Sequence, residues 1–306
     1  MNVTICYMTN RRDCRFEWFH SSLLRQMGGE RLCKLVVVDF YADERPQERK
    51  ALADVWVTPK PTVWQGAHRL VSGNYFAPSN ARNTGLCYAE GTHVVFVDDL
   101  SVLMPGWWDI VRDEVENDRQ RVTLGRYTKV GDLQVEGGEA VSWRKYPTGE
   151  DHRYNPDFGP VLVSCSGGWM YGASVCVPVK AMLEINGFDE DCDSMGGEDY
   201  AAGIMLEHRG WEIVYHQGMW TLEDEMLHHV EVPFKRIIKH RGPGSTFPER
   251  DASLHYLNLV KHRGRDRAPN YCNLATLREH MLAGGEFPVS QIPEHDWRDG
   301  QPLREM

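Results

Sequence analysis

Two pairs of neighbouring carboxylates stand out in the sequence, because acidic side chains can transfer protons and bind cations. Glu198 and Asp199 follow the two glycines of Met195-Gly-Gly-Glu-Asp-Tyr200. The next residues predict a helix that ends at Arg209-Gly210, so both carboxylates are expected at a helix N-terminus, where the dipole favours their ionised form. An ionised carboxylate there can act as the general base for an attacking hydroxyl. The alternative is an ordinary helix start with acidic residues in its first turn.

The second pair, Asp98 and Asp99, follows the apolar run His93–Val97, which predicts a buried strand. Two carboxylates at a strand tip raise each other's pKa unless a cation is close. A divalent ion bound to a diphosphate would relieve that repulsion. Two solvated turn aspartates are the alternative. Taken together, the two acidic pairs and the histidines downstream (His216, His228 and His229) favour a single metal-assisted site.

The elements around these pairs predict how they are positioned. Val3–Thr9 and Leu35–Asp39 have the pattern of buried strands, with a helix over residues 15–28 between them. This order predicts parallel pairing, and ligands of such sheets bind beyond the carboxyl ends of the strands. Thr9 and Asp39 should therefore face one crevice. Asp39 would accept hydrogen bonds there from a base or ribose, or serve only as a turn residue.

Further along, a helix is predicted from Ser79, whose hydroxyl would cap it, to Gly91. Arg82 lies in its first turns, where a cation opposes the helix dipole unless it meets a ligand. Residues 112–145 are predicted to form antiparallel strands, and residues 146–160 an active-site loop.

Composition limits the class of protein. The 306 residues are 42% hydrophobic with a formal net charge of −10, which indicates a globular chain and no general affinity for polyanions. The eight cysteines include no Cys-x-x-Cys pair, which argues against a zinc site or a disulfide framework. No signal peptide and no apolar run of about 20 residues is evident, so we expect no membrane span and a cytoplasmic protein.

Four motifs in order carry a family resemblance. Ala81-Arg-Asn-Thr-Gly85, Phe96-Val-Asp-Asp99, Gly187-Phe-Asp189 and Gly196-Gly-Glu-Asp199 resemble the motif series of GT-A-fold family-2 glycosyltransferases. The last motif also resembles a C-terminal signature of galactosyltransferases. The similarity runs from Val3 to about His216, and phage-type members are among the relatives that it suggests.

The resemblance implies an α/β chain with the GT-A fold, a Rossmann-like single domain that binds a nucleotide-sugar on a mixed central sheet. Residues 1–225 would form this domain, with a nucleotide-binding half in 1–100 and an acceptor half in 101–225. Residues 226–306 would form a basic, helical C-terminal extension.

The resemblance also implies roles for particular residues. Asp199 would be the catalytic base and Glu198 would bind the acceptor hydroxyl. Leu100 stands where the family usually has the metal-binding aspartate of its Asp-x-Asp motif, so this chain departs from the pattern. The other expected residues are the donor contacts Thr9, Asp39, Arg82, Asn83 and Asp98, the metal ligands Asp98, Asp99 and His228, and an acceptor surface at Gly168 and Trp169. The alternative for Trp169 is an ordinary tryptophan of the hydrophobic core.

The implied activity is inverting, metal-assisted transfer of a sugar from a nucleotide-sugar, a UDP-sugar, to an acceptor hydroxyl, with Mn²⁺ or Mg²⁺ as the cofactor. The acceptor would be a glycan or a small molecule. The basic segment 235–267 keeps a hydroxymethylated base in DNA as an alternative acceptor. A non-catalytic module that binds nucleotide-sugars is the remaining alternative.

Overall fold

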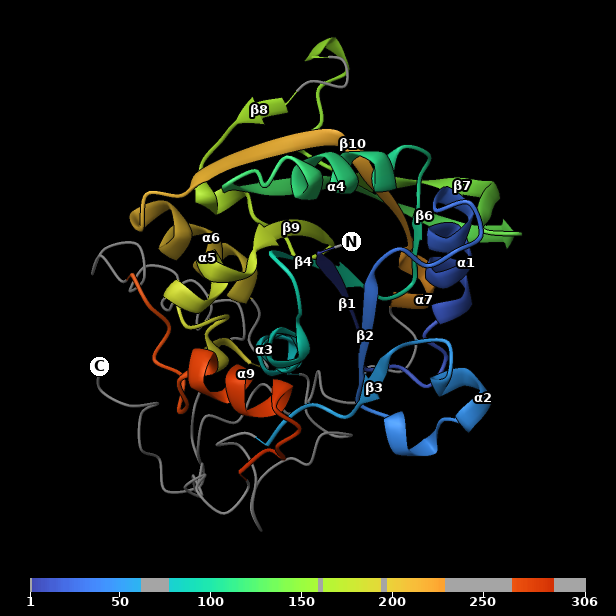
Figure 1. Ribbon diagram of the computed structural model, residues 1–306. Coiled ribbons are helices and arrows are strands. Elements are labelled where there is room, and N and C mark those ends of the chain that lie inside the picture. The colour runs from blue at the N-terminus through green and yellow to red at the C-terminus, as the bar shows by residue number, and fades with distance from the viewer. Residues whose placement is uncertain (1, 62–76, 159–161, 194–196, 229–265, 289–306) are drawn as a thin grey trace, which may run out of the picture.

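A mixed ten-stranded sheet forms the centre of the protein, in a computed structural model that describes residues 2–61, 77–158, 162–193, 197–228 and 266–288 (Figure 1). The strand order is β3-β2-β1-β4-β9-β6-β10-β5, with β7 on β6 and β8 on β10. The N-terminal strands are parallel, as expected: β1 (Val3–Thr9) lies between β2 (Lys34–Asp39) and β4 (His93–Asp98), and β3 (Val55–Val57) extends the sheet beyond β2. The predicted α/β class with a mixed central sheet is confirmed.

The second half of the sheet mixes strand directions. The strand β9 (Ser174–Pro178) is antiparallel to both β4 and β6, while β10 runs parallel to β6. The remaining strands are β5 (Ser101–Leu103), β6 (Arg121–Glu136), β7 (Glu139–Glu150), β8 (Leu162–Ser164) and β10 (Glu212–Asp224).

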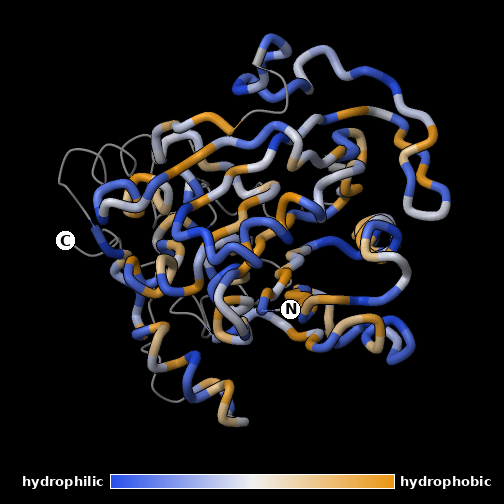
Figure 2. Tube along the Cα trace, turned by 45° about the horizontal axis from the view of Figure 1, so that its top comes forward, coloured by the Kyte–Doolittle hydropathy of each residue, from blue (hydrophilic) through white to orange (hydrophobic). Residues whose placement is uncertain are grey.

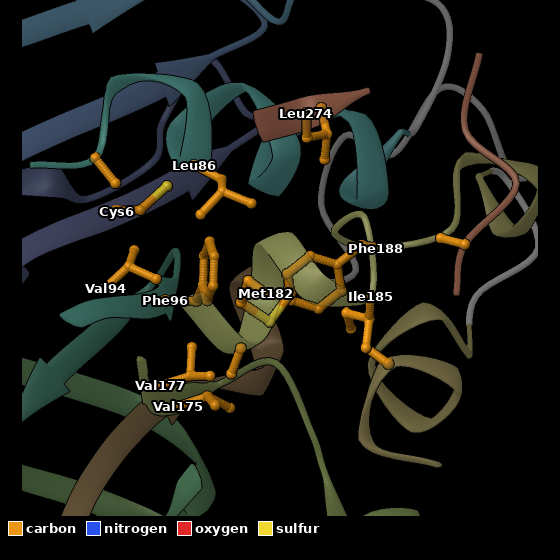
Figure 3. Packing of buried hydrophobic residues seen from close by; sticks show 14 of the residues in the cluster. Cys6, Leu86, Val94, Phe96, Val175, Val177, Met182, Ile185, Phe188 and Leu274 are labelled. Carbon is orange, nitrogen blue, oxygen red and sulfur yellow. The ribbon is translucent and has the colours of Figure 1, made fainter. Parts of the chain in front are cut away.

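Helices cover both faces of the sheet, because side chains of each buried strand alternate between them. Ile5 and Tyr7 of β1 pack with α1 (Phe16–Gln26) and α4 (Trp107–Glu116). Cys6 and Met8 point to the opposite cluster, part of which Figure 3 shows. That face is covered by α3 (Pro78–Tyr88), α5 (Val179–Glu184), α6 (Glu198–His208) and α9 (Leu274–Leu282). Figure 2 shows the hydropathy of each residue along the same chain.

Short elements complete the chain. They are the helices α2 (Gln47–Lys50) and α7 (Glu225–His228) and the 3-10 turns η1 (Ala42–Glu44), η3 (Pro156–Phe158), η4 (Gly167–Trp169) and η5 (Glu190–Cys192). In the part of the chain that the structure describes, no helix combines the length and apolar character needed to cross a bilayer.

Three local predictions were wrong. Residues 112–116 belong to α4, because Trp107, Trp108, Val111 and Val115 recur at helical spacing and are all buried. Ser79 does not cap α3, and its buried hydroxyl has no hydrogen-bond partner among the described residues. The Asp193 carboxylate caps α3 instead, accepting a hydrogen bond from the Ser79 backbone N–H at 2.8 Å. The predicted loop 146–160 begins later, since β7 extends to Glu150.

The described part of the C-terminal segment packs on the main core. Helix α9 lies against α3 (Figure 1), and its residues Leu274, Leu277 and Met281 belong to the same buried cluster as Leu86 of α3. The predicted boundary at residue 226 stays a prediction, but the energetic contribution of α9 can be measured.

Leu274→Ala should lower the free energy of unfolding by about 2–5 kcal/mol, since the removed side chain is fully buried and leaves a cavity. Leu282→Ala is the matched control on the same helix, because Leu282 is 39% exposed and should change stability by less than about 0.5 kcal/mol. Urea denaturation followed by circular dichroism measures both. Equal effects of the two substitutions would contradict the docking of α9 into the core.

Candidate active site

Three predicted donor residues come together at one edge of the sheet. Thr9 ends β1 and is in register with Asp39, which ends β2, while Met8 of β1 is in register with Asp98 at the end of β4. Parallel strands place their carboxyl ends at the same edge, which is where α/β sheets bind ligands. The structure thus brings Thr9, Asp39 and Asp98 to the tips of adjacent strands.

Asp39 is the most enclosed of the three. Its side chain is fully buried and accepts hydrogen bonds from Arg45 Nε at 2.6 Å, Trp56 Nε1 at 3.1 Å and the Tyr41 N–H at 2.8 Å. These partners fix the carboxylate and anchor the segment that follows β2.

Asp99 is held by groups from β1 and the residues after it. The Thr9 hydroxyl donates to Asp99 Oδ2 at 2.7 Å, and Arg11 Nε lies 3.1 Å from the same oxygen. Both side chains of the ion pair are nearly buried. Burial raises the pKa of Asp99 to about 6, although the positive charge of Arg11 opposes the change. Sequence reasoning missed Arg11, which looks like an ordinary loop residue.

Asp98 is the more accessible member of the pair. Its side chain is 31% exposed, and Oδ1 accepts a hydrogen bond from Arg82 Nη2 at 2.8 Å. No described residue donates to Oδ2, which leaves that oxygen for a ligand. The next turn contains Leu100 in the left-handed region with φ of 60°, and its side chain is buried. The residue that departs from the family motif therefore packs into the interior.

Arg82 connects the two acidic pairs. Its Nη1 donates to Glu198 Oε1 at 2.5 Å, while Nη2 binds Asp98. The guanidinium is 3% exposed, and its Nε has no hydrogen-bond partner among the described residues. Gly172 provides the space, because a Cβ at that position would collide with Nη2. The positive charge of Arg82 is unfavourable near the N-terminus of α3, and two carboxylates from distant segments, Asp98 and Glu198, stabilise it.

Asp199 lies in the first turn of α6, which starts after Gly197 with φ of 88°. Its Oδ1 accepts from the Tyr200 N–H at 2.7 Å, and Oδ2 accepts from the Gly172 N–H at 3.0 Å. Burial raises the pKa of Asp199, and the charge of Arg82 partly opposes this. Burial and the charge of Asp199 raise the pKa of Glu198 to about 7. The backbone donors orient the Asp199 carboxylate, and a raised pKa makes it a stronger base.

The structure also places the three remaining predicted residues, Asn83, Gly168 and Trp169. Asn83 is fully buried, and its amide bonds to the backbone of Phe188 and to Glu190 rather than to Asp98. Gly168 approaches the ring of Tyr200. Trp169 is half-buried and packs edge-on against Tyr215 with the ring centroids 5.9 Å apart.

The predicted histidine ligand and the predicted basic segment lie largely outside the described residues. His228 is the last residue of α7, but its side chain is not described, and His229 is not described at all. The basic segment 235–267 is described only from residue 266 onward.

Glu223 is an acidic residue near the strand tips that the sequence analysis missed. It lies on β10 beside Ser101, the third residue after Asp98, and its buried Oε1 has no hydrogen-bond partner among the described residues. Burial, followed by the charge of Asp98, raises the pKa of Glu223 to about 8. The acidic run that ends the strand was its only signal in the sequence.

The chemistry of this edge fits a divalent cation. Carboxylates outnumber guanidinium groups there, and burial, with a smaller contribution from neighbouring carboxylates, raises the pKa values of Asp99, Glu198 and Glu223. Within the described residues, no three Asp, Glu, His or Cys side chains are close enough to enclose an ion. Mg²⁺ sites commonly use one or two carboxylates together with substrate phosphates, so Asp98 and Asp99 fit an ion that is shared with a bound diphosphate.

The sheet order and the strand-tip site define an α/β fold of the GT-A type, and comparison with solved structures agrees. The protein is similar to the crystal structure of GalNAc-T7 with UDP, GalNAc and Mn²⁺, with a TM-score of 0.50 and 11% identity over 94% of this chain. A second similar structure is S. aureus TarS 1–349 in complex with UDP-GlcNAc, with a TM-score of 0.47 and 14% identity over 86% of this chain and 73% of that one.

The similarity to GalNAc-T7 establishes the fold of this chain. The chain spans 58% of the length of the GalNAc-T7 chain. No family model matches the sequence, and comparison with curated protein sequences gives no match.

Arg82→Gln should raise the pKa of both Glu198 and Asp199, because Arg82 is the positive charge that favours their ionised forms. NMR titration of the side-chain carboxyl carbons measures the two pKa values directly. Arg82→Lys, which keeps the charge, should change them less, and Arg112→Gln on the exposed face of α4 should leave them unchanged. Unaltered pKa values in Arg82→Gln would contradict the electrostatic role of Arg82.

Proposed function

We propose that this protein is an inverting glycosyltransferase that moves a sugar from a nucleotide-sugar, a UDP-sugar, to an acceptor hydroxyl. One observation carries the proposal: Arg82 joins Asp98 at the strand tip to Glu198 beside Asp199 within a GT-A fold. A cation-binding carboxylate and a base are thereby held in one site. The GalNAc-T7 structure, which contains UDP and Mn²⁺, supports the same class of donor and cofactor.

The donor half of the site is the acidic edge of the sheet. The nucleotide would lie along the tips of β1 and β2, near Thr9 and Asp39, with its diphosphate towards Asp98. A bound Mn²⁺ or Mg²⁺ would neutralise the diphosphate and stabilise it as the leaving group. Arg11 and Arg82 hold the carboxylates of Asp99 and Asp98 in place for that purpose.

The base is Asp199. Each of its oxygens accepts one backbone N–H and keeps a lone pair for a further hydrogen bond. The acceptor hydroxyl would give its proton to Asp199 as its oxygen forms the bond to the anomeric carbon and the bond to the diphosphate breaks. A single displacement of this kind inverts the anomeric centre. Holding both reactants in line would supply much of the rate.

Asp199→Asn should reduce sugar transfer by about 10²–10⁴-fold, the usual contribution of a general base, and leave UDP affinity within about twofold of wild type. UDP release with a panel of UDP-sugars measures turnover, and isothermal titration with UDP measures binding. Asp109→Asn, on the exposed surface of α4, is the control. A fully active Asp199→Asn enzyme would remove Asp199 from the mechanism. UDP binding without turnover in the wild type would favour a non-catalytic binding module.

Asp98→Asn should abolish most of the gain in UDP affinity that Mn²⁺ provides, because the exposed carboxylate oxygen is lost. UDP titrations with and without Mn²⁺ give this gain as a ratio of two dissociation constants. Asp132→Asn, at an exposed ion pair on β6, should retain the wild-type ratio. A ratio unchanged by Asp98→Asn would place the ion at other residues.

A further inference from the structure

A tyrosine that the sequence analysis did not single out lies beside the proposed base. Tyr171 directly precedes Gly172, whose backbone N–H donates to Asp199 Oδ2 at 3.0 Å. Burial and the negative charge of Asp199 raise the pKa of Tyr171, which agrees with the closeness of the two side chains. The backbone segment that contacts Asp199 through Gly172 therefore also carries the ring of Tyr171.

Tyr171 is the middle member of a row of three rings. Its centroid lies 6.0 Å from that of Tyr127 on β6 and 5.5 Å from that of His152 in the segment after β7, with edge-to-face geometry in both pairs. Tyr127 and Tyr171 are half-buried and His152 is exposed. We call Tyr127, His152 and Tyr171 the aromatic platform.

A buried arginine, Arg153, packs against two rings of the platform. The Arg153 guanidinium lies 4.9 Å from the ring centroid of Tyr171 and 5.6 Å from that of Tyr127. It is completely buried, paired with Asp151 at 2.7 Å, and it donates to the carbonyl of Gly125 at 2.8 Å. A buried cation with this many fixed partners cannot move without losing them, so the rings are held in place before a ligand arrives. Preorganised rings bind at a lower entropic cost.

The cations near the aromatic platform are paired with carboxylates. Each cation of β6 and of the segment after β7 that the structure describes near the rings has a carboxylate partner. The pairs are Arg126–Glu150 at 2.9 Å, Lys129–Glu225 at 2.9 Å and Arg153–Asp151 at 2.7 Å. Nucleic acids are bound chiefly through cations that contact their phosphates. These paired cations favour an uncharged ring over a polyanion, and partly exposed aromatic faces suit such a ring.

We propose that the aromatic platform is the acceptor subsite and that the acceptor is an uncharged saccharide. One sugar ring would pack on Tyr171 and Tyr127, with His152 at the rim, and would direct a hydroxyl to Asp199. This inference rests on the proposed glycosyltransferase function, and it selects among the acceptor classes that the sequence leaves open.

The test measures acceptor binding to the full chain saturated with UDP and Mn²⁺. The probes are a panel of methyl glycosides and neutral oligosaccharides, and separately a DNA duplex with hydroxymethylated bases, followed by saturation-transfer NMR and titration. Tyr171→Leu and Tyr127→Leu should each raise the saccharide dissociation constant at least tenfold, whereas Tyr171→Phe, which keeps the ring, should stay within about threefold. UDP affinity should be unchanged in all three. Tyr271→Leu, an exposed tyrosine near α9, is the control.

Two results would overturn the inference. One is that no saccharide of the panel binds in a way that depends on Tyr171. The other is that sugar is transferred only to the hydroxymethylated duplex. In both cases UDP binding and UDP-sugar hydrolysis would still support the proposed function. A wild-type protein that neither binds UDP nor hydrolyses any UDP-sugar would instead contradict the proposed function itself.

Discussion

The buried guanidinium of Arg82 is the constraint on which the site depends. A charge removed from water is costly unless it is paired and hydrogen-bonded, and Arg82 meets that condition only between Asp98 and Glu198. Its pairing therefore fixes three elements together: helix α3, the tip of β4 and the start of α6. Gly172 is part of the same constraint, because the guanidinium fills the space of a side chain there. Asp98 and Asp199, the proposed cation ligand and the proposed base, are therefore positioned relative to each other through this one residue.

The helix that carries Arg82 is anchored by a second buried network. Asp193 caps its N-terminus from the segment before α6, and Lys60 pairs with Glu190 at 2.6 Å. Asn83 donates to Glu190 at 2.9 Å. These contacts tie α3 to the chain between α5 and α6, and they help to fix the helix that carries Arg82. Such rigidity is what a preorganised catalytic site requires.

The two halves of the site differ in their electrostatics. Around the strand tips, carboxylates lie close together. Burial, and to a smaller extent the charge of Asp98, raises the pKa values of Asp99 and Glu223, and a divalent cation would favour their ionised forms. On the other side of Asp199, cations and carboxylates are matched and aromatic rings are partly exposed. An ion with its diphosphate suits the first half, and a neutral ring suits the second. The proposed base lies between them.

The sequence alone determined the central strands and the sheet edge at which their terminal carboxylates gather. Strand β1 has its predicted bounds, because an apolar run that is buried on both faces of a strand is a local pattern. Carboxylates at strand ends likewise predicted the edge of the sheet that carries the site. The tertiary structure decided which side chains meet. Ser79 was predicted to cap its own helix, yet Asp193, distant in the sequence, does so. Arg11 and Tyr171 gave no local signal, and Glu223 gave only the acidic run that ends its strand, because their roles come from contacts with residues on other elements. The partner of a side chain and its burial depend on how distant segments pack, and local sequence patterns do not contain that information.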